Sequence, residues 1–163
     1  MSRFDFIASD RPIPEVENPY IQIFSVNEAL EKGIEVPKVL LEKADLDRDK
    51  KIMLIVDSEE HIDELKIFTT RSYHEAARHT KKAYISEIQW RYTKERGKQL
   101  KEYIHQFLED TNEVELWRTW YDDQAEPIIY RLYESELRLK HIEKVFKDKG
   151  FERPEGIIIE KDK

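Results

Sequence analysis

Residues 55–64, IVDSEEHIDE, bring carboxylates, a serine and a histidine together in one short segment. Asp57 follows a nearly continuous apolar run, so we expect it at the carboxyl end of a buried strand, where ligands often bind in α/β sheets. Asp57, Glu60 and His61 have the side chains for general acid–base work or for binding a divalent cation. The alternative is that Asp57 or Ser58 caps a helical turn and the rest is exposed turn chemistry. We favour the turn, because no second cluster completes a catalytic arrangement.

Two other segments resemble metal-binding motifs, and both fail on spacing. His74 and His79 are five residues apart, which on an ideal helix turns them about 140° away from each other, whereas the H-E-x-x-H motif needs four. We expect both to be surface residues of a short charged helix. The acidic segment 45–49 begins like a calcium loop, but Lys50 and Val56 stand where that loop needs Gly and Glu. No glycine-rich phosphate loop is present either, so we expect no metal and no cofactor.

An aromatic and acidic segment is the best candidate for binding another macromolecule. Trp and Tyr supply many of the residues that dominate binding energies, and acidic surfaces speed association with basic partners. The predicted contact residues are Trp117, Trp120, Tyr121, Glu113, Glu115, Asp122 and Asp123. This prediction requires at least one of the three aromatic side chains to be solvent-exposed. If all three are buried, the Asp57–His61 region becomes the better candidate.

Charge is distributed unevenly along the chain. The 163 residues include 28 Lys and Arg and 35 Asp and Glu, a net charge of −7. Residues 71–101 carry a net +6, whereas residues 1–70 carry −7 and residues 102–163 carry −6. An acidic chain repels phosphate backbones, so a nucleic-acid partner is not expected, and the basic stretch is expected to pair with acids of the same molecule.

Composition excludes several classes of protein. The absence of cysteine excludes disulfide scaffolds and thiol catalysis. No apolar run approaches 18 residues, and the first ten residues lack the apolar core of a secretory signal. We expect a soluble cytoplasmic protein, monomeric or homodimeric, that does not enter a membrane.

The second half of the chain has the clearer pattern of elements. Thr93 is placed to cap a helix whose apolar residues recur at helical spacing. The predicted elements, in order, are a strand at 83–92, a helix at 94–110, a hairpin of strands at 113–121 and 127–133, a helix at 136–149 capped by Ser135, and a strand at 156–161. This β-α-β-β-α-β order is that of a ferredoxin-like sandwich, with both helices on one face of the sheet.

The first half is richer in strands. Strands are expected at 3–9, 20–26, 51–57 and 63–71, with capping boxes at Ser25–Glu28 and Ser72–Glu75. The run KIMLIVD at 51–57 is nearly continuous in apolar residues, as expected for a strand covered on both faces.

Together these patterns predict one α+β domain over residues 1–163. Its strand-rich part, 1–72, would pack on or extend the sheet of a ferredoxin-like part, 81–161.

The residue patterns leave two function classes open. We favour a non-enzymatic, interaction- or inhibitor-type protein that binds a basic protein partner, because no catalytic motif is present. The alternative is a small enzyme or anionic-metabolite-binding domain with its site near Asp57–His61. Fold class does not choose between them, because ferredoxin-like sandwiches host both.

Overall fold

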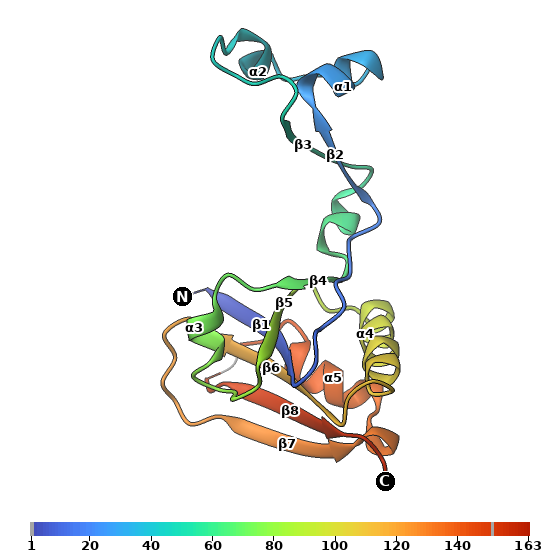
Figure 1. Cartoon of the computed structure of the whole chain (residues 1–163), viewed down its shortest axis with the longest axis vertical. Helices are drawn as coiled ribbons and strands as arrows, with labels where there is room; N and C mark the ends of the chain where they lie inside the picture. The colour runs from blue at the N-terminus through green and yellow to red at the C-terminus, as the bar shows by residue number, and fades with distance from the viewer. Residues whose placement is uncertain (1, 151) are drawn as a thin grey trace. The chain divides into compact units, whose positions relative to one another are not determined.

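The computed structural model describes residues 2–150 and 152–163 (Figure 1). Two compact units are present: a large unit, made of the residues up to Glu17 and Glu64–Lys163, and a small unit, Asn18–Asp63. Both mix helices with strands, so the α+β class is confirmed. Among the described helices, none has the length and apolar character needed to cross a membrane.

The large unit is built on a six-stranded sheet with the order β4-β5-β1-β6-β8-β7. Neighbouring strands are antiparallel, except that β7 and β8 run parallel. The strands are β1 (Arg3–Ser9), β4 (Lys66–Thr69), β5 (Tyr84–Gln89), β6 (Glu113–Trp120), β7 (Ile128–Tyr133) and β8 (Glu155–Glu160). The predicted strands at 3–9, 83–92, 113–121, 127–133 and 156–161 are therefore present with small changes of boundary.

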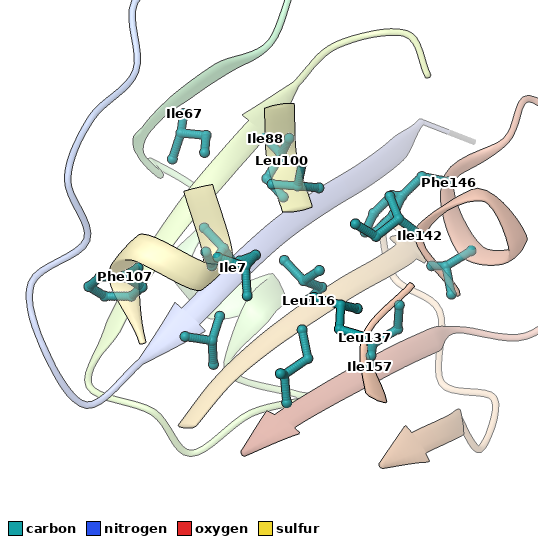
Figure 2. Close-up of a cluster of buried hydrophobic side chains, with 14 of the residues drawn as sticks. Ile7, Ile67, Ile88, Leu100, Phe107, Leu116, Leu137, Ile142, Phe146 and Ile157 are labelled. Atoms are coloured by element: carbon teal, nitrogen blue, oxygen red, sulfur yellow. The ribbon is translucent and has the colours of Figure 1, made fainter. Parts of the chain in front are cut away.

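Helices α4 (Lys94–Phe107) and α5 (Leu139–Phe146) share one hydrophobic core on one face of this sheet, as predicted (Figure 2). Leu100, Ile104 and Phe107 of α4 are buried there. Thr93 caps α4, since its hydroxyl accepts a hydrogen bond from the Arg96 N–H at 3.2 Å. The apolar stripe and the helix cap that the sequence predicted are therefore both present in the structure.

The ferredoxin-like arrangement is not confirmed by the order of strands in the sheet. The β-α-β-β-α-β sequence of elements is present, but β1 lies between β5 and β6. The predicted hairpin between 113–121 and 127–133 is wrong, since β8 pairs with both β6 and β7 and separates them. The alternation of apolar and polar residues along a strand indicates which face is buried, but it does not indicate which neighbouring strand pairs with it.

The start of the last helix also differs from expectation. Residues Glu134–Glu136 form a 3₁₀ turn, η2, and α5 begins only at Leu139. Ser135 does not cap it, because its N–H and hydroxyl both donate to the Asp162 carboxylate.

The opposite face of the sheet carries a second, smaller core. Phe4, Phe6 and Trp117 are buried there with Ala76 of helix α3 (Tyr73–Ala76). The Ser72 hydroxyl lies 3.0 Å from the Tyr121 hydroxyl rather than capping α3, so the predicted capping box is absent. Ala76 and this hydroxyl contact hold α3 and the turns after it against the sheet.

A buried ion pair crosses the centre of the sheet beneath α5. Arg118 on β6 donates to both carboxylate oxygens of Asp5 on β1, at 2.9 and 3.0 Å, and the two side chains are 1% and 3% exposed. The same guanidinium donates to the Lys147 carbonyl and lies 5.3 Å from the centre of the Phe146 ring. Glu155 on β8 stands opposite Arg118 in the register.

The small unit is a two-stranded antiparallel sheet with two short helices. Strands β2 (Ile21–Ser25) and β3 (Lys51–Val56) pair, and α1 (Val26–Glu31), α2 (Lys38–Glu42) and the 3₁₀ turn η1 (Glu59–Asp63) complete it. The predicted Ser25–Glu28 capping box is confirmed. Its core is centred on Val26, Ala29, Val36 and Met53.

Candidate functional site

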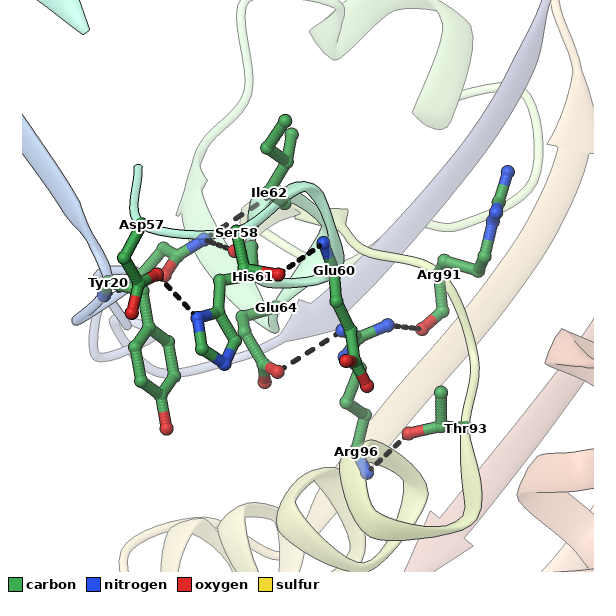
Figure 3. A network of polar contacts seen from close by, with 11 residues as sticks. Tyr20, Asp57, Ser58, Glu60, His61, Ile62, Glu64, Arg91, Thr93 and Arg96 are labelled. Atoms are coloured by element: carbon green, nitrogen blue, oxygen red, sulfur yellow. Dashed lines mark hydrogen bonds and ion pairs between the residues drawn. The ribbon is translucent and has the colours of Figure 1, made fainter. Parts of the chain in front are cut away.

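Asp57 and His61, two of the residues that the sequence pattern singled out, meet in the small unit (Figure 3). The Asp57 Oδ1 and His61 Nδ1 atoms are 2.6 Å apart, and the His61 ring stacks on Tyr20 with ring centres 3.8 Å apart. The hydrogen bond from His61 lowers the pKa of the Asp57 carboxyl. Asn18 fixes the backbone below the ring by donating to the His61 carbonyl at 2.7 Å. Nδ1 donates to the carboxylate in this pair, and in the neutral form of the ring Nε2 is then an acceptor.

This pair is open to water. The Asp57 side chain is 67% exposed and the His61 side chain 28% exposed. The Glu60 N–H donates to the Ser58 hydroxyl, as expected of a turn. Among the described residues, no group of three or more His, Asp or Glu side chains is arranged to hold a metal ion. The geometry supports an exposed, hydrogen-bonded turn.

The predicted aromatic and acidic surface is only partly assembled. Trp117 is 1% exposed, stacks on Phe6 and donates its indole N–H to Glu115 at 2.8 Å, so it does not provide an exposed anchor. Trp120 and Tyr121 are half-buried. Glu113 pairs with Lys82, and Asp122 pairs with Arg78. The seven residues therefore do not form one open surface, and a contact role for Trp120 and Tyr121 stays a prediction.

The basic stretch is paired in part within the molecule: among the described residues, at least four of its nine Lys and Arg form ion pairs with acidic side chains. Arg96 is buried and donates to Glu64 at 3.1 Å and to the Arg91 carbonyl at 3.0 Å, both drawn in Figure 3. Further pairs in this stretch are Arg78 with Glu75, Lys82 with Asp10 and Lys98 with Glu95.

A cavity of about 480 Å³ opens beside the loop between β6 and β7. It is lined by Arg78 and His79, which follow α3, and by residues 123–127 of the loop. The loop begins with a turn in which Asp122 has a left-handed backbone, φ 60°. The Glu75 carboxylate accepts from the Asp122 N–H at 3.0 Å, so the segment around α3 holds this wall of the cavity in place.

His79 has one ring nitrogen that can accept a hydrogen bond. The Thr119 hydroxyl donates to the Trp120 carbonyl and lies 3.2 Å from His79 Nε2, so Nε2 carries the proton and donates to Thr119. Nδ1 is then the free acceptor. Burial lowers the pKa of His79, which keeps the ring neutral at pH 7. The prediction that His79 is a surface residue of a helix is wrong, because α3 ends at Ala76 and the ring packs 5.7 Å from Trp117.

Asp123 is the second acceptor of the cavity. Its Oδ1 accepts from the Ala125 N–H at 2.9 Å. Its Oδ2 is buried and accepts no hydrogen bond from any described residue. Buried polar atoms in proteins are nearly always paired, so this oxygen calls for an explanation.

The small unit contributes a different kind of feature, an aliphatic sheet face. Phe24, Met53 and Ile55 point into its core, so the alternate residues of β2 and β3 point the other way. This second face, here named the outer face, consists of the paired residues Ile21, Ile23, Leu54 and Val56 and of the exposed Ile52, which precedes Met53 on β3. Ile23 and Leu54 stand opposite each other and are 51% and 57% exposed.

Neither the cavity nor the outer face was predicted from the sequence. His79 and Asp123 are 44 positions apart, so no local pattern joins them. The outer face did leave a signal, since the continuous apolar run at 51–57 predicted a strand covered on both faces, whereas the structure covers one.

Comparison with known proteins adds no assignment, because no family model, no curated protein and no solved structure matches this chain.

Proposed function

We propose that this chain is a non-enzymatic binding protein that docks onto a basic protein partner through the outer face of its small unit. The observation that carries the proposal is the half-exposed aliphatic pair Ile23 and Leu54 at the centre of a two-stranded sheet. Two strands alone are marginal in water and need packing on their faces. The helices of the small unit supply that packing on one face only.

Exposed apolar side chains are concentrated in this unit. Of eleven large hydrophobic residues that are exposed among those described, seven lie in the 46 residues of the small unit. Single exposed apolar residues are normal, but a contiguous patch is typical of an interaction site. The outer face contains no charged residue, so its centre can be covered by an apolar surface without leaving a charge unpaired.

The net charge of the small unit favours a partner of opposite charge. The small unit has eleven Asp and Glu against six Lys and Arg, a net charge of −5, whereas the remainder of the chain has 24 against 22, a net charge of −2. Two copies of this unit brought face to face would repel each other. A partner with an apolar patch bordered by Lys and Arg would instead be attracted over roughly 10 Å at moderate salt. We place this role in the cytoplasm, where a cysteine-free chain needs no oxidising environment.

Two labelled peptides test the proposal on the whole chain. One alternates Lys with Val and the other alternates Glu with Val, so they share an apolar face and differ in charge. Fluorescence anisotropy should show binding of the Lys peptide alone, weakening as salt is added. The double variant Ile23→Thr/Leu54→Thr keeps good strand formers and removes the apolar face. At about 1 kcal/mol per half-buried side chain, it should weaken binding at least tenfold.

Val39→Thr is the matched control, because Val39 is 69% exposed in the same unit but lies on α2. It should leave binding unchanged. Equal binding of both peptides, or equal loss in the control, contradicts the proposal. Sedimentation of the wild type as a dimer that the double variant dissociates would instead assign the outer face to a second copy.

One observation favours the enzyme alternative as a second candidate: the hydrogen bond between Asp57 and His61 engages Nδ1 and leaves Nε2 of the neutral ring as an acceptor. Acid–base chemistry at this pair would be abolished by His61→Gln with no loss of peptide binding. The exposure of both side chains weighs against it, because catalytic electrostatics gain their strength from excluding water.

A further inference from the structure

The cavity between His79 and the 123–127 loop lies wholly in the large unit, so it is independent of the outer face. Its volume of about 480 Å³ falls within the roughly 300–1,000 Å³ of typical ligand sites. It is formed by two segments far apart in the chain, joined by the hydrogen bond from the Asp122 N–H to Glu75.

Besides the donors of Arg78 and Gln124, the residues that line the cavity include two acceptors. His79 Nδ1 is an unprotonated nitrogen, because Nε2 donates to Thr119. Asp123 lines the cavity with a carboxylate that accepts one hydrogen bond through Oδ1, from the Ala125 N–H. A ligand that supplies positive charge and donors therefore complements this part of the lining.

Charge around the cavity selects the sign of the ligand. The Arg78 guanidinium, the cation of the described lining, is shared between Glu75 at 3.4 Å and Asp122 at 3.5 Å. Asp123 and Glu126 then leave the lining with excess negative charge, which excludes anions and attracts cations. A metal ion does not suit the site, since no group of three ligating side chains is present in the part of the chain that the structure describes.

We propose that this cavity binds an alkylammonium or alkylguanidinium group, with the cation beside the Asp123 carboxylate and the His79 ring. Ala125 and Pro127 line the same cavity and provide apolar contact for the methylene stem. Both lysine and arginine side chains of a protein and free polyamines carry such a group.

The binding test uses the full chain and four soluble probes. N-acetyl-lysine methylamide and N-acetyl-arginine methylamide represent side chains, spermidine represents free amines, and N-acetyl-norleucine methylamide has the stem without the charge. Imidazole resonances of His79 in ¹H–¹⁵N NMR should shift saturably with the cationic probes and not with norleucine. Tighter binding of the side-chain probes indicates a protein ligand, and tighter binding of spermidine indicates a free amine.

Asp123→Asn is the decisive variant, because an amide oxygen can still accept from the Ala125 N–H while the negative charge is lost. It should weaken binding of the lysine probe at least tenfold, in keeping with the strength of charge-assisted hydrogen bonds. Asp45→Asn, the same change at an exposed position of the small unit, should have no effect.

A pH titration supplies a readout that a structural role would not move. Besides burial, the groups that influence His79 are Asp123 and Glu75, which raise its pKa, and Arg78, which lowers it. A bound cation beside the imidazole ring should lower the pKa of His79 further, and binding should weaken as the ring protonates. Absence of saturable shifts, equal binding of norleucine, or unchanged affinity in Asp123→Asn would overturn the proposal.

Discussion

Removing the buried guanidinium of Arg118 should strongly destabilise the large unit. Arg118→Met keeps an unbranched side chain of similar length but removes the charge and the donors. The Asp5 carboxylate would then be left 3% exposed, with its nearest remaining cation the half-exposed Arg3 at 3.8 Å. Glu155, which stands opposite Arg118 in the register and is also buried, would lose the same neighbouring charge.

The loss of stability depends on which buried charges remain without an oppositely charged partner. Breaking a buried ion pair by removing one partner costs about 3–5 kcal/mol, a large part of the roughly 5–15 kcal/mol that stabilises a typical domain. Asp5→Asn should cost less, because Arg118 keeps its hydrogen bond to the Lys147 carbonyl, its contact with the Phe146 ring and its position beside Glu155. The double variant should lose less than the two single losses combined.

Urea unfolding followed by far-UV circular dichroism measures these free energies. Arg131→Met is the control, because Arg131 is an exposed arginine on β7, and it should change stability by less than about 0.5 kcal/mol. If Arg118→Met unfolds at the same urea concentration as the control, or if the single losses simply add in the double variant, the ion pair does not stabilise the fold as argued.

Three further predictions use the same unfolding assay. Phe107→Ala should cost about 3–5 kcal/mol and Lys101→Ala less than about 0.5 kcal/mol, because the first side chain is buried under α4 and the second is not; similar urea midpoints would disprove this assignment of the helix face. Gly156→Ala should destabilise β8, since its new Cβ would stand 2.7 Å from the Trp117 ring, and restored stability on adding Trp117→Leu would identify that clash. His79→Gln should flatten the acid side of the stability profile: with the folded-state pKa of His79 lowered, the unfolded chain binds the proton more readily as pH falls below about 6.5, so wild-type stability declines there and the variant's declines less.

Local patterns were enough to predict individual elements. The apolar stripe and the Thr93 cap located α4, because helix period and capping depend on residues within a few positions of one another. The Ser25–Glu28 capping box at the start of α1 was predicted for the same reason. The Asp57–His61 contact was also within reach of the sequence, since four residues of turn bring those side chains together.

Pairing between distant strands was not predictable from such patterns. β6 carries apolar residues on both faces, which marks it as central but fits any neighbour equally well. The structure places β1 on one side of it and β8 on the other, and so separates β6 from β7, the strand that follows it in the chain. Strand order depends on which combination buries both cores, and that choice involves the whole large unit.

The candidate sites show the same difference between what local sequence predicts and what only the tertiary structure decides. The sequence alone determined that the 51–57 strand is apolar enough for two covered faces, because that property is held in consecutive residues. Only the tertiary structure decided that one face stays open, since this depends on which elements pack over the strand. Tertiary structure alone also set His79 against the loop of Asp123: α3 is anchored to the sheet by Ala76, and the hydrogen bond between Glu75 and Asp122 then brings together two segments that no local spacing relates.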